Sequence, residues 1–188
     1  EVLDIIKYIK DIMIKKGFKL EIGLDIAASS FFNKKYFYNN PKMVLSREQQ
    51  IEYISNLIEK YNLFYVEDAL EENDFEGFSK LMKKIKSKCL IVGDDLIATN
   101  PDRLKKAIKN KSINAVIVKP NQIGSMIKVK EVIDICKKNK IKTIISHRSG
   151  ESEDYTIADL AVGFNVDFIK TGIYGRVRES KLRRLINI

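Results

Sequence analysis

The chain has 188 residues, of which 45% are hydrophobic and 31% are charged. This length suits one domain with a hydrophobic core, and the composition excludes a disordered chain. No apolar run approaches the roughly 20 residues that span a bilayer, and the first residues do not resemble a signal peptide, so we predict no transmembrane segment.

The net charge of +9 comes largely from lysine. Lysines cluster at residues 83–88 and 137–142, each time between a predicted helix end and the next strand. Lysine in a last helical turn complements the helix dipole. Aromatic residues are not interleaved with these clusters, as a nucleic-acid platform would require. We interpret them as solvated surface and predict no nucleic-acid partner.

Two cysteines and one histidine limit the metal and redox chemistry. Cys89 and Cys136 are far apart and form no CxxC pair, and His147 is the sole histidine. These numbers exclude a conventional zinc cluster and favour a reducing, cytoplasmic environment.

Helices and strands alternate in the first half of the chain. Apolar side chains at helical spacing predict a first helix that stops at Gly17, and Ser46 with Gln49 forms a capping-box pattern. The predicted elements are a helix over 2–16, a strand over 19–25, a helix over 46–61, a strand over 63–68 and a helix over 74–86.

The second half continues the alternation. Asn100 and Pro101 have the pattern of a helix start, where proline is tolerated. The predicted elements are a strand over 89–95, a helix over 100–111, strands over 115–120, 142–148 and 167–172, each preceded by a helical segment, and a last helix from residue 176. Short apolar strands that alternate with helices indicate an α/β fold with a parallel sheet.

Each predicted strand ends in an ionisable residue. These residues are Asp25, Glu67, Asp94, Lys119, His147 and Lys170. After a first interval that spans a long loop, they recur every 23 to 28 residues, which indicates a regular βα repeat. In a (β/α)8 barrel the carboxyl ends of the strands converge on one mouth, so we expect these six side chains to face a common space.

The order of these residue types suggests a chemistry. Any single one could be an ordinary turn residue or helix cap, but three acids followed by cations form a sorted set. Asp25, Glu67 and Asp94 offer the oxygen ligands that Mg²⁺ prefers. Lys119 is a candidate base. His147, Arg148 and Ser149 could together hold an anion, because arginine favours bidentate phosphate contacts.

Motifs along the whole chain resemble the C-terminal catalytic region of the enolase family. The matching stretches are IGLDIAASSFF, VEDALEENDFEGF, IVGDDLIATNPDRL, VKPNQIG, SHRSGESEDYTIADLAVG and IKTG, in the family's order. The resemblance implies an enolase-type (β/α)8 TIM barrel over residues 1–188, incomplete here, with about six C-terminal βα units. It implies phosphopyruvate hydratase activity, the Mg²⁺-dependent reversible dehydration of 2-phosphoglycerate to phosphoenolpyruvate in glycolysis and gluconeogenesis.

The same resemblance assigns roles to individual residues. The implied metal ligands are Asp25, Glu67 and Asp94; the implied catalytic residues are Lys119 and His147; the implied substrate-binding residues are Lys119, Arg148, Ser149 and Lys170. We interpret Asp68 and Asp95 as supporting acids. A further set is interpreted as acids at a helix start: Glu151, Glu153 and Asp154.

The sequence also departs from the family pattern. The family's proton donor is a glutamate upstream of the first metal aspartate, and it matches no position here. The capping N-terminal domain, the lid loops and the first barrel strands match nothing either. We therefore expect the isolated chain to be inactive and to need the missing N-terminal part, in a cytoplasmic enzyme that is a homo-oligomer when complete. The alternative is a noncatalytic, enolase-derived binding or structural fragment.

Overall fold

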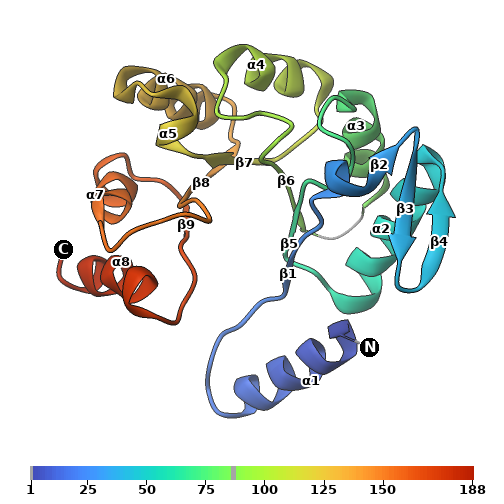
Figure 1. Cartoon of the computed structure of the whole chain (residues 1–188), viewed down its shortest axis with the longest axis horizontal. Coiled ribbons are helices and arrows are strands. Elements are labelled where there is room, and N and C mark those ends of the chain that lie inside the picture. Colours follow the sequence, from blue (N-terminus) through green and yellow to red (C-terminus); the bar gives the residue numbers. More distant parts are fainter. Residues whose placement is uncertain (1, 86–87) are drawn as a thin grey trace. The chain divides into compact units, whose positions relative to one another are not determined.

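The structure is a computed structural model that describes residues 2–85 and 88–188. Helices and strands alternate along these residues, which confirms the predicted α/β class (Figure 1). The chain divides into two compact units. The first comprises Glu1–Val92 and Lys109–Ile113, and the second comprises Gly93–Ile108 and Asn114–Ile188.

The first unit is organised on short parallel strands. They are β1 (Gly23–Asp25), β5 (Tyr65–Glu67) and β6 (Leu90–Gly93), hydrogen-bonded in that order, with β6 ending at the boundary between the units. Asp25 lies opposite Glu67, and Glu67 lies opposite Val92. Because the strands run in the same direction, their carboxyl ends share one edge.

Local signals fix the helices of this unit, α1 (Val2–Lys15), α2 (Arg47–Tyr61) and α3 (Phe75–Lys84). The predicted capping box is present at α2, where the Ser46 hydroxyl accepts from the Gln49 amide and the Gln49 side chain accepts from the Ser46 amide. Asp74 caps α3 by accepting from the Gly77 amide at 2.8 Å. Lys86, the predicted last residue of this helix, lies outside the described residues.

The three helices bury very different amounts of apolar surface. Helix α2 buries the side chains of Ile51, Ile54 and Ile58. Helix α1 forms as predicted, yet it has no buried residue. A helix whose apolar residues stay exposed gains little from packing, so the position of α1 depends on contacts such as the 2.9 Å hydrogen bond from the Tyr61 hydroxyl to Asp4.

The long loop expected after β1 contains structure of its own. A 3₁₀ helix, η1 (Ala28–Phe31), leads into the antiparallel strands β2 (Phe32–Asn33), β3 (Lys35–Asn39) and β4 (Lys42–Leu45). Tyr36 of β3 is 1% exposed, and its hydroxyl accepts from the Glu71 amide at 3.1 Å. This contact connects the antiparallel sheet to the loop that follows β5.

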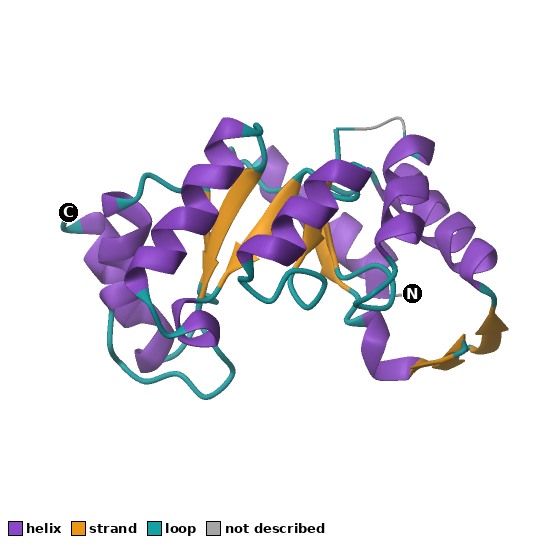
Figure 2. Cartoon of the chain, turned by 90° about the horizontal axis from the view of Figure 1, so that it is seen from above, coloured by secondary structure: helices purple, strands orange, loops and turns teal. Residues whose placement is uncertain are grey.

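The second unit repeats the βα pattern. Its elements are α4 (Pro101–Asn110, of which the residues up to Ile108 belong here), β7 (Ala115–Val118), α5 (Pro120–Ile123), α6 (Met126–Lys138), β8 (Lys142–Ser146), α7 (Thr156–Gly163), β9 (Phe168–Lys170) and α8 (Arg176–Ile186) (Figure 1). Figure 2 distinguishes the helices of the chain from its strands by colour. Strands β7, β8 and β9 are parallel and follow the chain order. The Asn100 side chain caps α4, as predicted, by accepting from the Asp102 amide at 2.8 Å.

The core of the second unit lies around β7. All four residues of this strand are fully buried. Helix α6 packs on β7 and β8, and α7 packs on β8 and β9 (Figure 1). The apolar face of α6 supplies Val129, Val132, Ile133 and Cys136, all of them buried. This packing holds the strand ends at which the candidate site residues lie.

Candidate active site

In the first unit, two candidate metal ligands lie side by side at the carboxyl edge. Asp25 ends β1 and is exposed, whereas Glu67 ends β5 and is buried. The Glu67 carboxylate accepts a hydrogen bond from the hydroxyl of Tyr65, two residues earlier on the same face of the strand. The Ile26 amide donates to the Glu67 carbonyl at 3.0 Å, which ties the two strand ends together.

In the second unit, the candidate ligand Asp94 forms an ion pair with the candidate base Lys119. Their side chains are 9% and 16% exposed. The Thr99 hydroxyl accepts from the Lys119 amide at 2.9 Å and donates to the Gln122 side chain at 2.6 Å, which fixes the turn after β7. Ligand oxygens of Asp94 and Asp95 lie within 4.8 Å of each other, so this corner of the unit offers two carboxylates to a cation.

The remaining candidates follow β8 and β9. Ser146 lies opposite Lys170 in the sheet, and the His147 amide donates to the Lys170 carbonyl at 3.2 Å. His147 and Lys170 therefore leave the same edge of the second unit. Arg148 and Ser149 come next along the loop and are exposed. Their predicted role in anion binding stays a prediction.

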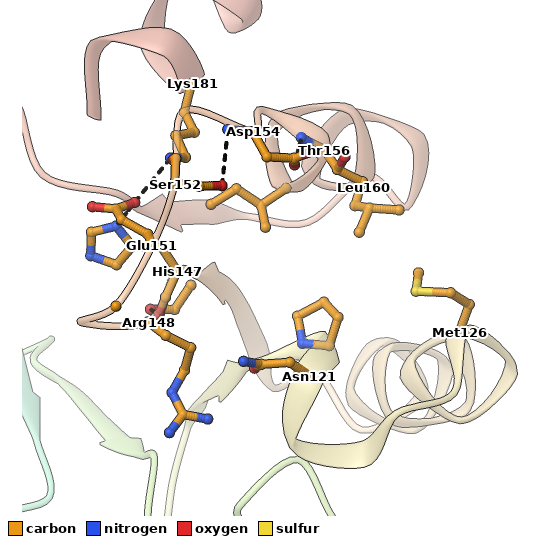
Figure 3. Close-up of a pocket in the computed structure, with 14 residues that line it drawn as sticks. Asn121, Met126, His147, Arg148, Glu151, Ser152, Asp154, Thr156, Leu160 and Lys181 are labelled. Atoms are coloured by element: carbon orange, nitrogen blue, oxygen red, sulfur yellow. Dashed lines mark hydrogen bonds and ion pairs between the residues drawn. The ribbon is translucent and has the colours of Figure 1, made fainter. Parts of the chain in front are cut away.

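A pocket of about 380 Å³ lies beside this loop (Figure 3). Its polar side includes His147, Arg148 and Asn121, and Met126 and Leu160 lie on another side. The full lining is Pro120, Asn121, Met126, Ser146, His147, Arg148, Gly150, Glu151, Ser152, Asp154, Thr156, Ile157, Leu160 and Lys181. The cavity thus has cationic and amide donors on one wall and apolar side chains on another, as small-molecule sites do.

One acid beside this pocket has a different role from the predicted one. The interpretation of Glu151 as a helix-start carboxylate is wrong, because α7 begins only at Thr156. Glu151 Oε2 lies 2.5 Å from Nδ1 of His147. Asp154 does act at the helix start, since it accepts from the Thr156 amide at 2.8 Å. Glu153 lies 3.3 Å from Arg176.

Sequence reasoning missed several residues that support the site. The spacing of Tyr65 and Glu67, two apart in a strand, could have indicated a contact on one face. The signal for Glu151 was weaker, because residues four apart are neighbours only in a helix and this segment is a loop. No local pattern pointed to Lys181, which reaches the loop from α8.

The parallel strands of both units, with helices between them and ionisable residues at their carboxyl ends, define an α/β protein built from βα units. Residues 1–188 match the family described as "Enolase, C-terminal TIM barrel domain". The chain therefore belongs to the enolase family, which confirms the resemblance read from its motifs and the predicted barrel class.

Curated relatives agree with this assignment. The chain is similar to the enolase of Archaeoglobus fulgidus, with 44% identity over 173 residues that cover 92% of the chain and 42% of the relative. It is also similar to the enolases of Methanosphaera stadtmanae, at 44% identity over 95% of the chain and 44% of the relative, and Sulfurisphaera tokodaii, at 50% over 90% and 41%. The chain thus spans less than half the length of these relatives. Among the described residues, no helix has both the length and the apolar character needed to cross a bilayer.

Proposed function

We propose that this chain is the C-terminal catalytic region of an enolase, which reversibly dehydrates 2-phosphoglycerate to phosphoenolpyruvate in glycolysis and gluconeogenesis. The observation that carries the proposal is the match of residues 1–188 to the enolase barrel, together with ionisable side chains at the carboxyl ends of six parallel strands. A glycolytic role would place the protein in the cytoplasm.

The donor set supports a magnesium site made of Asp25, Glu67 and Asp94. Glu67 is 1% exposed and Asp94 is 6% exposed. In this structure the Tyr65 hydroxyl and the Lys119 amine stabilise these buried carboxylates, whose negative charge would also favour a cation. Three carboxylate oxygens suit a small, hard cation that keeps some of its waters. Mg²⁺, when bound, would offset the negative charge that develops on the substrate carboxylate.

Lys119 is proposed to remove the proton from C2 of 2-phosphoglycerate. Its amine donates to Asp94 in this structure. An ammonium group has no lone pair, so Lys119 must lose a proton and leave Asp94 before it can act as a base. The use of a lysine or histidine base with Mg²⁺ is an established property of the enolase superfamily.

The cations of β8 and β9 are proposed to bind the substrate. Arg148 and Ser149 would hold the phosphate, because guanidinium and hydroxyl donors suit its oxygens. Lys119 and Lys170 would contact the carboxylate end and stabilise its extra charge. His147 is proposed to contact the part of the substrate that reacts, through its imidazole ring.

Departure of hydroxide from C3 requires an acid, and the residues assigned above do not include one. We infer that the proton donor comes from the N-terminal part of the relatives, and that the complete enzyme is a homo-oligomer. General acid catalysis typically contributes 10²–10⁴-fold, so the 188-residue chain alone should be inactive.

The test is the dehydration of 2-phosphoglycerate, followed through the absorbance of phosphoenolpyruvate. The chain is assayed alone and joined to the segment that precedes it in its gene, with Lys119→Ala in the joined protein as control. We expect turnover only in the joined protein without the substitution. Turnover by the chain alone would contradict the inference about the missing acid. A folded, joined protein without turnover would favour a noncatalytic role.

A further inference from the structure

Lys181 is a buried lysine on the inner side of α8. It is 2% exposed, whereas the neighbouring cations Arg178 and Arg183 have side chains that are 50% and 75% exposed. Its amine donates to the carbonyls of Ser152 and Val177. Burying an ammonium group costs free energy unless hydrogen bonds and opposite charges compensate it. Solubility alone would not require a lysine at this buried position.

The acid that faces Lys181 is Glu151. The Lys181 amine lies 3.1 Å from Oε2 of Glu151, and Nε of Arg178 lies 3.5 Å from its other oxygen. The Glu151 side chain is 9% exposed. Burial alone would raise the pKa of Glu151, but the hydrogen bonds from Lys181 and His147 lower it below its usual value of 4.5. The carboxylate is therefore ionised at neutral pH and held from several sides.

The third member of the cluster is His147. The same Glu151 oxygen that meets Lys181 lies 2.5 Å from Nδ1 of the imidazole ring. Figure 3 shows Lys181, Glu151 and His147 in a row, with dashed contacts between successive members. An ionised carboxylate only accepts hydrogen bonds, so Nδ1 must carry a proton. In the neutral ring, Nε2 then carries the lone pair.

We propose that Glu151 and Lys181 are positioning residues that hold His147 with its proton on Nδ1 and its Nε2 free to meet the substrate. The inference rests on the proposed function for the part that concerns turnover. The arrangement has the logic of catalytic and metal-binding sites in which a carboxylate fixes the tautomer and the orientation of a histidine. Lys181 extends it by fixing the carboxylate.

The cluster joins three separate parts of the second unit. His147 directly follows β8, Glu151 lies in the next loop, and Lys181 reaches them from α8, 30 residues beyond Glu151. If the cluster only held the loop in place, the bonds from Lys181 to the loop carbonyls would suffice. The carboxylate would then have no need to contact the imidazole. The charged residues next to His147 along the chain and across the sheet are Arg148, the next residue, and Lys170, whose backbone carbonyl accepts from the His147 amide.

The presence of one histidine makes the proposal directly measurable. In the uniformly ¹⁵N-labelled chain at alkaline pH, the two nitrogens of the neutral ring give distinct long-range ¹H–¹⁵N signals that report which nitrogen is protonated. We expect Nδ1–H in the unsubstituted chain. A ring protonated on Nε2 would overturn the proposal without the need for any variant.

Two variants and one matched control then assign the role of each residue. Glu151→Ala should move the proton largely to Nε2, the preference of a free neutral imidazole, whereas Glu153→Ala should leave the spectrum unchanged. Lys181→Met keeps most of the length of the side chain without its charge and should reduce the Nδ1–H share in part, because Arg178 still faces Glu151. An unchanged tautomer ratio in Glu151→Ala would overturn the role of Glu151. The same result in Lys181→Met would overturn that of Lys181.

The kinetic test uses the joined protein of the proposed function. Glu151→Ala should lower kcat roughly 10- to 100-fold, the range for removal of an outer partner of a functional histidine, with a smaller change in KM. A change confined to KM, or no change, would limit the cluster to structure and overturn its positioning role. If the joined protein has no turnover at all, the proposed function fails while the tautomer measurement still decides the proposal about the ring.

Discussion

The two ends of strands β8 and β9 both carry an acid–base contact, and the contacts differ in their surroundings. At the amino ends, Lys142 lies 2.6 Å from Asp167, with side chains that are 53% and 30% exposed. At the carboxyl ends, His147 lies 2.5 Å from Glu151, with side chains that are 19% and 9% exposed. The distances are alike, so the difference lies in desolvation and in the other groups that each acid holds.

Asp167 accepts hydrogen bonds from the neighbouring strand. It accepts from the Thr143 amide at 2.9 Å and from the Thr143 hydroxyl at 3.2 Å, so it fastens β9 to β8. Glu151 instead holds side chains, those of His147 and Lys181. The comparison agrees with the general division of barrels into a stabilising amino-terminal face and a catalytic carboxyl-terminal face.

The carboxyl end also has a second kind of contact. In the pair of Lys119 and Asp94, both partners are candidate site residues. Under the proposed function, this pair opens when substrate and metal bind, whereas the contact between Glu151 and His147 persists throughout the reaction.

The largest effect, on turnover, is expected at the pair of Lys119 and Asp94. Lys119→Met in the joined protein should lower turnover by about 10²–10⁴-fold, because a general base is lost. Stability should change little, since the flexible methionine side chain can fill the space of the lysine stem. Turnover and urea unfolding of the same preparation measure the two effects. A stability loss that accounts for the missing turnover would show that Lys119 is structural.

The next largest effect, on stability, is expected at the contacts of Glu151 with His147 and Lys181. Glu151→Ala should reduce the free energy of unfolding of the chain by about 3 kcal/mol, because it leaves the buried Lys181 without its acid. Urea titration followed by circular dichroism measures it. The double variant Glu151→Ala with Lys181→Met should recover part of the loss, since the uncompensated charge is gone. Equal losses in the single and the double variant would contradict this account.

The positions of several candidate residues at strand ends could be predicted because the signals are local. Each strand is a short apolar run bounded by an ionisable residue, so the positions of Asp25, Lys119 and Lys170 followed directly from the sequence. The helix caps at Ser46 and Asn100 were equally readable, because a cap depends on side chains within three residues of one another.

The features that could not be predicted depend on contacts between residues that are far apart in the sequence, or on segments without a clear pattern. Lys181 looks like one more surface cation in a basic helix, and its burial arises from the packing of α8 against α7 and the loop before it. Strand β2 has only two residues, and β3 (KYFYN) and β4 (KMVL) do not alternate strictly between apolar and polar residues. The core residue Tyr36 was hidden in them for the same reason.

A smaller effect is expected at the amino end. Burial alone would raise the pKa of Asp167, but the Lys142 ammonium and the Thr143 amide lower it below its usual value of 3.8. A lowered pKa in the folded state stabilises the protein above the unfolded value, and this contribution is lost as the pH falls through the folded value. Asp167→Asn should therefore cost about 1–2 kcal/mol at pH 7 and progressively less as the pH falls below the unfolded value of 3.8. Thermal unfolding at pH 7 and at a series of lower pH values measures it; a loss that does not change with pH would contradict the electrostatic explanation.

The smallest effect is expected at the exposed pair of Lys130 and Asp134 on α6. Their 2.6 Å distance equals that of the pair of Lys142 and Asp167, but the side chains are 61% and 44% exposed. Water already solvates both charges, and holding two long side chains in place costs conformational entropy. Lys130→Met should change the free energy of unfolding by no more than about 0.5 kcal/mol. The two pairs have the same distance and differ in exposure. A loss in urea titration as large as that of Asp167→Asn would therefore show that distance alone sets the energy of such a pair. It would also remove the basis for treating Glu151 and Asp167 differently.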